Sequence, residues 1–503
     1  MTVVDEVAPR GVGERSRHGL VAGAFVWCCV VVIWALAAGT VGAFSDQTQI
    51  IFIALALSTL GVIGAAAMSR ELGVRTALAR LKLGPWMAIG FALGFGVATL
   101  VWLAGDINGY HGIVTGGTLG PGAVVAGVGF VALLLSYRLA PRLLIDRGSR
   151  TDAHLRGRGD FYAGAGAVWS LWGVAIATEA VGFARGSLGY LSDPTAALST
   201  SSSLNAVLSS LTGMGLLATL VAAWRFAATR NPGSALLLAW VGGSQIALGL
   251  FSASKQDAII QFVALVVGYS AKGKIRLVPV AIAGLIALFL ITPFVTAYRS
   301  KIVTSSGRLS PTEALQSVDF TTLLGSSTTG DGTGGPSGQL GARLSRIGDV
   351  AIVVTKSPST VPFVSSLELI TGPALGFVPR SLWPGKPVQD AGYQANISYY
   401  GAPPSVHSSA SLTPYGDLYR HGGVVVVVVG MSALGMFVRA VDDRAGTVAT
   451  ADPRLMFLPM LLFATLVKQE TDFVSLSAGI VSVVLAAALA VRIVSRAPIG
   501  RFR

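Results

Sequence analysis

The sequence predicts an all-α polytopic membrane protein with about twelve transmembrane helices and one large external loop. Its 503 residues are 52% hydrophobic and only 12% charged, and the mean hydropathy is +0.67. Soluble globular domains are about 25% charged, so this composition excludes them. Apolar runs long enough to cross a bilayer recur along the chain, and positive charge is concentrated in alternate loops between them.

The predicted transmembrane helices follow from apolar segments, since a helix needs about 20 mostly apolar residues to cross the hydrocarbon of a bilayer. Two of the segments, 257–271 and 454–467, are short for this role. Small residues inside the segments, among them many glycines, let membrane helices approach one another closely. The segments are 20–44, 49–68, 85–104, 121–140, 161–184, 204–224, 234–254, 257–271, 277–297, 422–440, 454–467 and 473–494.

Lys and Arg set the predicted orientation, because loops rich in these residues stay in the cytoplasm. Residues 138–158 and 225–230 are basic, whereas 45–48, 105–120 and 185–203 are nearly free of Lys and Arg. The alternation places both termini in the cytoplasm. It also spreads the net charge of +13 over many short loops and forms no single basic patch, so no nucleic-acid partner is needed to explain the charge.

This topology divides the chain into five regions, of which the third is the long extramembrane segment. The two cysteines, Cys28 and Cys29, are adjacent inside the first apolar segment, so they form no disulfide framework. The sequence has no Cys/His cluster with metal-ligand spacing and no phosphate-binding glycine loop. The regions are a cytoplasmic N-terminal tail at 1–19, a nine-helix transmembrane region at 20–297, a large extracytoplasmic loop at 298–421, a three-helix transmembrane region at 422–494 and a cytoplasmic C-terminal tail at 495–503.

The densest cluster of unusual residues lies at 379–387 in the large loop. Three prolines among these positions exclude a helix interior or a central strand and predict a stiff, extended loop. Arg380, Trp383 and Lys386 lie on it; the two cations suit phosphate or carboxylate, and the indole ring offers a flat face to a sugar or a cation. The structural alternative is a turn whose basic residues face water or lipid headgroups.

Three further segments complete the candidate site. Residues 340–355 have apolar residues at helical spacing beside Arg343 and Arg346, which predicts an amphipathic helix on the membrane surface or against the helix bundle. Two short loops, 252–257 and 468–472, carry charge close to the membrane. Their side chains either extend from helix ends toward water or face the same external cavity as the large loop.

The large loop resembles that of the Wzy-type O-antigen or oligosaccharide repeat-unit polymerases, which are multi-span membrane enzymes. The family pattern Pro-Arg-x-x-Trp-Pro-x-Lys-Pro is filled at every position of 379–387. The specific resemblance covers roughly residues 340–425, and the rest of the chain matches in topology alone.

Two further motifs extend the resemblance less strictly. The family motif Gly-Glu-x-Tyr-x-Asn-Phe-Gly keeps its spacing at 416–423, but Asp417, His421 and Gly422 replace Glu, Asn and Phe. A third likeness is a Gly-Ser-Arg-like turn, in which Lys255 takes the place of the arginine. The first motif is therefore the most specific of the three.

The resemblance implies transfer of a growing chain from its polyprenyl-pyrophosphate carrier to a sugar hydroxyl of the next lipid-linked unit, at the outer face of the cytoplasmic (inner) membrane. Such a reaction needs cations for the leaving pyrophosphate, a base for the hydroxyl proton, and aromatic or polar side chains for the sugars. The candidates are Arg380, Lys386, Arg299 and Arg343 for phosphate, Asp417, Glu470, Asp472 and His407 for the base, Trp383, Tyr393, Tyr399, Tyr400, Tyr415 and Tyr419 for sugar, and Lys255 as a further substrate-binding residue.

Among these candidates, Arg380 and Lys386 are the preferred catalytic cations. The base stays open, with Asp417 leading because it lies between Gly and Tyr at the mouth of a span. Arg343 can instead face lipid headgroups, and His407 can be an ordinary surface histidine. The expected partners are the polyprenyl-pyrophosphate-linked oligosaccharide, the bilayer, a chain-length regulator and a flippase, and no metal or cofactor is expected.

Three alternatives belong to other classes. An O-antigen ligase-like or other lipid-linked-sugar glycosyltransferase shares both chemistry and topology. A twelve-helix transporter would show paired halves and charges at mid-membrane, whereas this chain has few charges in its apolar segments, with Glu179 as an exception near an outer end. A non-catalytic membrane scaffold gives no reason for the Arg, Trp and Lys at 379–387.

Overall fold

The computed structural model describes residues 46–69, 77–78, 80–104, 116–140, 164–185, 202–270, 345–377, 383, 391–404, 409–446 and 452–496, together with isolated positions between 284 and 308. Within these residues, eight helices are long and apolar enough to cross a membrane. The predicted multi-pass helical membrane protein is thereby confirmed. The predicted segment 20–44 and most of 277–297 lie outside the described residues.

The helices of the membrane part follow the predicted apolar segments. The segment 234–254, for example, forms α11 (Pro232–Phe251), whose start is fixed by Pro232 in the first turn and by the Asn231 side chain, which accepts a hydrogen bond from Ser234 N at 2.7 Å. The other helices are α2 (Asp46–Met68), α4 (Leu83–Phe91), the π-helix η1 (Ala92–Val97), α5 (Ala98–Ala104), α6 (Gly116–Leu139), α8 (Ala165–Ala184), α10 (Ser202–Thr229), α12 (Lys255–Ser270), α21 (Gly423–Gly446), the 3₁₀ helix η5 (Pro453–Met456), α22 (Phe457–Lys468) and α23 (Phe473–Arg496).

The part of the chain predicted as the large loop is largely helical where it is described. Two two-residue strands pair antiparallel at its start, with Val303 opposite Arg308. These elements are β1 (Val303–Thr304), β2 (Gly307–Arg308), α17 (Ile347–Lys356), α18 (Glu368–Phe377), α19 (Ala391–Tyr400) and α20 (Thr413–Arg420).

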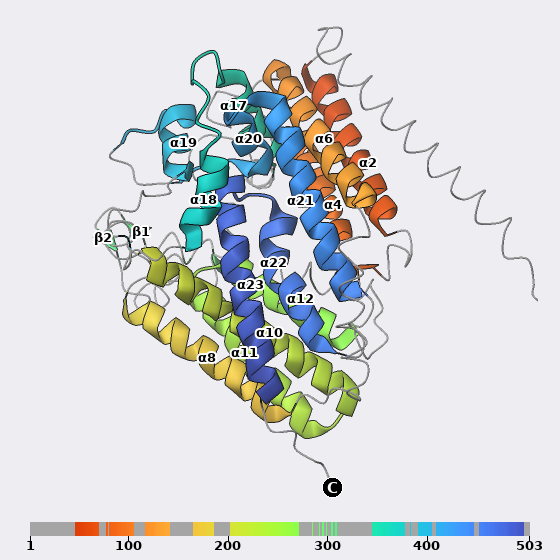
Figure 1. Ribbon diagram of the computed structural model, residues 1–503, viewed down its shortest axis with the longest axis vertical. Helices are drawn as coiled ribbons and strands as arrows, with labels where there is room; N and C mark the ends of the chain where they lie inside the picture. The colour runs from red at the N-terminus through yellow and green to blue at the C-terminus, as the bar shows by residue number, and fades with distance from the viewer. Residues whose placement is uncertain are drawn as a thin grey trace, which may run out of the picture.

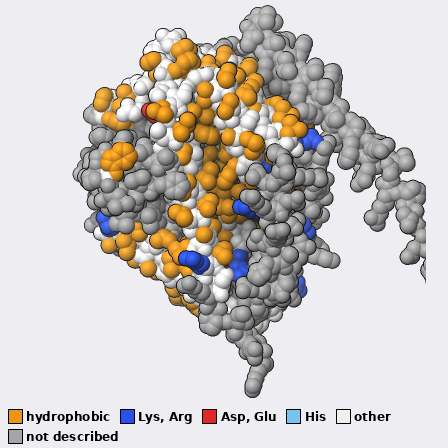
Figure 2. All heavy atoms as spheres, in the orientation of Figure 1, with side chains coloured by type: hydrophobic (Ala, Val, Ile, Leu, Met, Phe, Trp, Pro, Cys, Tyr) orange, Lys and Arg blue, Asp and Glu red, His pale blue; other side chains and the backbone are white. Residues whose placement is uncertain are grey.

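The membrane helices form two groups that α22 joins (Figure 1). In the first group α2, α4, α6 and α21 pack together, and in the second α10 contacts α8, α11 and α12. Helix α22 packs on α4 and α10, and α23 packs on α10 and α8. Hydrophobic side chains cover most of the described part of the face in Figure 2, as expected for helices that meet lipid.

Helices α6 and α21 run in parallel and close together. Gly129 of α6 faces Val427, and Gly435 of α21 faces the Leu133 carbonyl, so that a side chain at either glycine would overlap its neighbour. Both helices therefore begin at the same end of the bundle. Helices α17 and α20 pack at that end, against the first turns of α6 and α21.

Helix α17 answers the open question about residues 340–355. It begins at Ile347, and residues 340–344 lie outside the described part. Its residues from Ile347 to Val353 are all buried, and its backbone at Ala351 is in close contact with Gly122 of α6. Of the two predicted locations, the membrane surface and the helix bundle, α17 lies against the helix bundle.

The opposite end of the first helix group is held by Asp442, near the end of α21. Its two carboxylate oxygens accept hydrogen bonds from Leu83 N at 2.6 Å and Gly84 N at 2.9 Å, and the Tyr137 hydroxyl donates a third at 2.9 Å. A carboxylate placed on the free N–H groups at the start of a helix stabilises that start. Asp442 thus ties α4, α6 and α21 together at this end.

Two short turns join α17 and α20 at the other end. Lys468 at the end of α22 donates to Gln256 Oε1 at 3.1 Å, which connects the α22–α23 turn to the start of α12. The start of α23, directly after this turn, contacts α20, because Val474 N donates to Asp417. The predicted charged loops 252–257 and 468–472 therefore lie at one end of the bundle, and it stays a prediction that this end faces outward.

Candidate functional site

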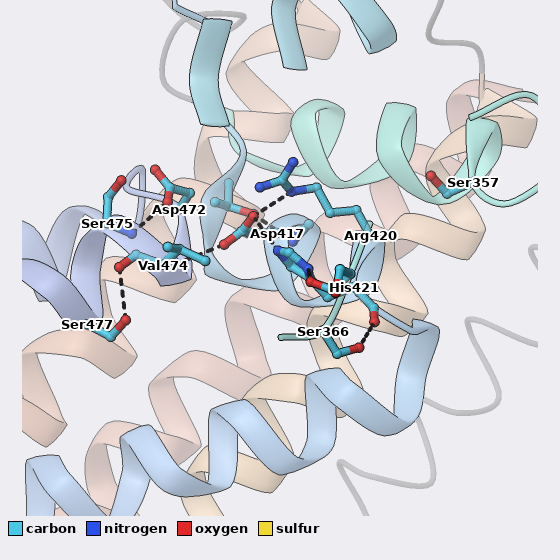
Figure 3. A network of polar contacts seen from close by, with 12 residues as sticks. Ser357, Ser366, Asp417, Arg420, His421, Asp472, Val474, Ser475 and Ser477 are labelled. Atoms are coloured by element: carbon cyan, nitrogen blue, oxygen red, sulfur yellow. Dashed lines mark hydrogen bonds and ion pairs between the residues drawn. The ribbon is translucent and has the colours of Figure 1, made fainter. Parts of the chain in front are cut away.

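The candidate site is built around Asp417, which is fully buried in the short helix α20. Pro414 in the first turn presets the backbone for this helix, which packs between α17, α21 and α23. Asp417 Oδ1 accepts a hydrogen bond from Arg420 Nε at 2.6 Å, and Oδ2 accepts one from Val474 N at 3.1 Å. Figure 3 shows this network, with His421 Nε2 also 3.7 Å from Oδ1.

The spacing in α20 accounts for this arrangement. Residues three and four positions apart share one face of a helix, so Arg420 and His421 reach back to Asp417. Burial would raise the pKa of the Asp417 carboxyl, but the neighbouring His421 imidazole and Arg420 guanidinium outweigh it and lower that pKa. Asp417 is therefore held as a carboxylate, which favours a positioning role over that of a proton acceptor.

Arg420 has a hydrogen-bond donor to spare. Its side chain is only 5% exposed, and its Nε is taken by Asp417. Its Nη2 is buried and has no hydrogen-bond partner among the described residues. A buried donor without an acceptor costs about 1–3 kcal/mol, and more when the group is charged, so this nitrogen is suited to an anionic ligand.

His421 is fixed by the segment that precedes α18. The Nδ1 atom of His421 lies 2.9 Å from the carbonyl oxygen of Ser365, and the backbone carbonyl of His421 accepts a hydrogen bond from Ser366 Oγ. Because a carbonyl can only accept, Nδ1 carries a proton, and Nε2 is the ring nitrogen that remains for other contacts. That nitrogen faces Asp417 and is likewise buried without a hydrogen bond in the described part of the chain.

The α22–α23 turn supplies a second group of charges. The carboxylate of Glu470 is ion-paired with Arg346, at the start of α17, and with Lys468. Ser411 Oγ donates to the Glu470 carbonyl at 3.1 Å. With two cations on its carboxylate, Glu470 links α17 to α22 and is poorly placed to accept a further proton.

Gln469 fixes the shape of this turn. It ends α22 in the left-handed region at φ 52°, which non-glycine residues seldom adopt. Its Oε1 accepts from the Tyr415 hydroxyl at 2.9 Å, and its Nε2 donates to the Met87 carbonyl at 2.8 Å. The turn is thus anchored to α20 on one side and to α4 on the other.

Asp472 is a partly exposed carboxyl of the site that has no ion pair among the described residues. Its Oδ1 accepts from Ser475 N at 2.7 Å and so caps the start of α23 (Figure 3). Burial, and then the nearby charge of Asp417, raise the pKa of Asp472. Among the described carboxyls of the site, Asp472 has the environment that best suits a general base.

The tyrosines predicted to hold sugar divide into two sets. Tyr399 and Tyr415 are buried and hydrogen-bonded within the fold, Tyr399 to Ser357 Oγ at 2.7 Å. Tyr393, Tyr400 and Tyr419 are partly exposed. The second set is therefore better placed to meet a ligand, although Tyr400 already donates to Asp349 and Tyr393 to the Pro404 carbonyl.

The structure brings some of the predicted site residues together. Asp417, Tyr419 and Glu470 lie in or beside the network, and Lys255 begins α12 at the same end of the bundle. Trp383 is 42% exposed and is the one described residue of 379–387. The residues that lie outside the described part of the chain are Arg380, Lys386, Arg299, Arg343 and His407.

Two arginines of the site were missed from the sequence. Arg420 stood at a variable position of the second motif, and its signal was the spacing of three residues from Asp417. Arg346 was noted beside the predicted amphipathic helix but was given no role in the site, because its partner Glu470 is far away in the chain. The described residues hold no group of three or more His, Cys, Asp or Glu placed to bind a metal ion.

These features define a multi-pass helical membrane protein with a buried charged cluster where its helices end. The chain belongs to the family described as Domain of unknown function (DUF8712), which matches residues 191–450. The matched part includes α17 and α20, and it ends before the α22–α23 turn. Comparisons with curated proteins and with solved structures found no match.

Proposed function

We propose that this protein polymerises polyprenyl-pyrophosphate-linked oligosaccharide repeat units into a cell-surface polysaccharide at the outer face of the cytoplasmic membrane. In this proposal the chain crosses the membrane twelve times, both termini are cytoplasmic, and residues 298–421 form the external loop. The bundle end that carries α17 and α20 then faces outward, where lipid-linked sugar is presented. A chain-length regulator and a flippase are the proposed protein partners.

The observation that carries the proposal is the spare donor of Arg420 where the membrane helices end. The guanidinium is fixed by Asp417 at 2.6 Å, so its remaining nitrogens have a defined direction. Arginine forms paired hydrogen bonds to phosphate oxygens, which a pyrophosphate leaving group requires as its charge develops. A pre-oriented buried guanidinium stabilises that charge without the cost of ordering the side chain during the reaction.

The remaining residues are given roles that suit their environments. Asp417 positions Arg420, and Asp472 takes the proton of the acceptor hydroxyl as the general base. Glu470 holds Arg346 in place. Arg380 and Lys386 of 379–387 add contacts to the pyrophosphate, and Trp383, whose ring is exposed, stacks on sugar.

Other assignments of the same chemistry stay open. An O-antigen ligase-like enzyme or another lipid-linked-sugar glycosyltransferase would also need a fixed guanidinium for pyrophosphate and a base for the acceptor. The spare donor of Arg420 supports these enzymes as much as a polymerase. A twelve-helix transporter would instead need a substrate-binding site between its membrane helices.

Deletion of the gene in its native host separates these functions. A polymerase predicts that single lipid-linked repeat units accumulate and that surface polymer is lost. A ligase predicts that finished lipid-linked polymer accumulates instead. Unchanged polymer and unchanged lipid-linked pools would contradict both, and complementation with the intact gene is the control.

A further inference from the structure

A second polar cluster lies inside the other helix group, away from the candidate site. It consists of Glu179 on α8, Gln245 on α11 and Gln261 on α12, and we call it the intramembrane polar cluster. Gln245 is 3% exposed and Gln261 is 5% exposed. In the part of the chain that the structure describes, Glu179 Oε2, Gln245 Nε2 and Gln261 Oε1 are buried and have no hydrogen-bond partner.

The α11–α12 hairpin brings the two glutamines to the same level. A Cβ on Gly249 would lie 2.6 Å from Ala258 N, so the two helices touch at this point. Gln245 lies one helical turn before Gly249, and Gln261 lies one turn after Ala258, each on the buried face of its helix. Both amides therefore lie about one turn below the close contact.

Helix α10 leaves room for the cluster. A side chain at Gly215 would overlap the amide of Gln245, so glycine at this position lets the amide lie against the α10 backbone. Because α10 packs on α8, α11 and α12, it forms the common wall of the cluster.

Glu179 completes the cluster from α8. Its carboxyl faces the amide of Gln245, and Asp257 at the start of α12 is within electrostatic reach. Two contacts between α8 and α11 lie on either side of it: Trp172 Nε1 donates to Ser244 Oγ at 2.9 Å, and the rings of Phe183 and Phe251 lie 5.8 Å apart. Glu179, which is partly exposed, thus lies between these two contacts of α8 with α11.

We propose that the intramembrane polar cluster binds one small monovalent cation, a sodium ion or a proton. Two acceptor oxygens of the cluster, Glu179 Oε2 and Gln261 Oε1, lack a donor among the described residues, and acceptors of this kind suit a cation. Carboxylate and amide oxygens are the ligands that hard cations prefer, and the one carboxylate of the cluster matches one positive charge. The two ends of the Gln245 amide are alike in shape, so half a turn about its last bond adds a third oxygen.

The free-energy cost of placing the Glu179 carboxylate within the membrane helices also favours a bound cation. A carboxylate inside a membrane protein is expensive unless it is paired, and such carboxyls mark ion and proton pathways. No Lys, Arg or His is ion-paired with Glu179 among the described residues. The cluster thus provides a cation-dependent element that does not depend on the proposed polymerase activity.

The test uses the full-length protein purified in detergent. Binding of radioactive sodium is measured at alkaline pH, and tryptophan fluorescence is followed as the pH is lowered without sodium, since Trp172 lies on the same helix as Glu179, about two turns before it. Wild type is compared with Glu179→Gln, with Gln261→Met and with the control Glu368→Gln, which makes the same chemical change on the exposed start of α18.

A sodium site predicts saturable binding to wild type and to Glu368→Gln, loss of binding in Glu179→Gln, and about tenfold weaker binding in Gln261→Met. A proton site predicts no sodium binding, but a fluorescence titration that Glu179→Gln abolishes and Glu368→Gln keeps. If Glu179→Gln does not fold, Gln261→Met must still shift the wild-type sodium affinity or titration. Absence of both signals in wild type, or equal signals in all variants, would overturn the proposal.

Discussion

Two buried aspartates lie at opposite ends of the first helix group, and they differ in what surrounds them. Asp442 and Asp417 are both 0% exposed. The donors to Asp442 are two backbone N–H groups, of Leu83 and Gly84, and the hydroxyl of Tyr137, all of which belong to the fold. A residue of this kind holds helices together and leaves nothing for a ligand.

Asp417 instead contacts two side chains, Arg420 and His421, that each keep a nitrogen without a hydrogen bond among the described residues. Its donors are Arg420 Nε and Val474 N, yet Arg420 Nη2 and His421 Nε2 remain without a hydrogen bond among the described residues. A buried carboxylate therefore does not by itself mark a functional site. The site is marked by Arg420, which Asp417 holds in place through Nε while Nη2 is left without an acceptor among the described residues.

The largest effect is expected at Arg420. Arg420→Ala should lower polymer formation about a hundred- to a thousandfold, because one transition-state contact of this kind is worth roughly 2.7–4 kcal/mol. Arg420→Lys keeps the charge but loses the fork, so it should also lose most activity. Polymer length on gels, normalised to protein level in the membrane, is the measurement.

Arg439→Lys is the matched control for Arg420→Lys. Arg439 pairs with Asp443 at 2.7 Å on α21, at the end of the bundle where Asp442 lies. It should leave polymer unchanged. Equal activity in the Arg420 and Arg439 variants would mean that the two ends of the bundle do not differ in function.

The next effect concerns the proton acceptor. Asp472→Asn should lower activity by about a hundredfold or more through loss of the general base. Asparagine caps a helix start about as well as aspartate, so α23 should remain stable. The assay is the initial rate in membranes containing equal amounts of protein.

The pH profile sharpens this prediction. The raised pKa of Asp472 means that wild-type activity should begin to fall with acid at a pH above about 3.9, the ordinary pKa of Asp. The lowered pKa of Asp417 places its own titration at lower pH. If Asp472→Asn kept the wild-type rate and the same fall of activity in acid, Asp472 would be excluded as the general base.

A smaller effect separates stability from activity. Asp442→Asn and Asp417→Asn each weaken hydrogen bonds to a buried charge, worth about 1.5–3 kcal/mol, so both should lower the unfolding temperature in detergent. Only Asp417→Asn should also lower activity per folded molecule, because it releases Arg420. If Asp442→Asn were equally inactive when folded, the contrast between the two aspartates would fail.

The contribution of Asp417 to stability should also depend on pH. Because the folded-state pKa of Asp417 is lowered, its contribution to stability is present above the unfolded pKa and is lost as the pH falls through the folded value. Asp417→Asn should therefore approach wild-type stability as the solution is acidified below about pH 3.9. Thermal unfolding in a series of buffers measures this convergence.

The smallest expected effect is that of a chelator. Arginine and lysine can neutralise pyrophosphate without a metal, so purified protein should keep its activity in excess chelator. Strict dependence on added magnesium or manganese would refute this and would shift the role of the Arg420 donor to a metal-bound substrate.

The sequence was sufficient for the membrane helices because their signal is local. The predicted segment 473–494 corresponds to α23 (Phe473–Arg496), since composition over one span decides whether a helix forms in lipid. The short segment 454–467 was also located, but its first turn is a 3₁₀ helix, Pro453–Met456, capped by Asp452. Such an end depends on single residues and not on hydropathy.

The candidate site could be predicted only in part, because its contacts join distant residues. The motif at 416–423 pointed to Asp417, and the charge of 468–472 pointed to Glu470. The ion pair of Glu470 with Arg346 and the contact of Asp417 with Val474 appear only after α17, α20 and α23 are packed together. The Arg420 spacing was local and could have been found.

The central claim is that Arg420 offers its spare donor to a phosphate-bearing lipid. Its most direct test is the affinity of the purified protein for a short-chain polyprenyl pyrophosphate, measured by calorimetry for wild type, Arg420→Lys and Arg439→Lys. Loss of one charge-assisted hydrogen bond worth about 1.5–3 kcal/mol predicts that Arg420→Lys binds at least about tenfold more weakly, while Arg439→Lys matches wild type. The same affinity in all three proteins would contradict the claim.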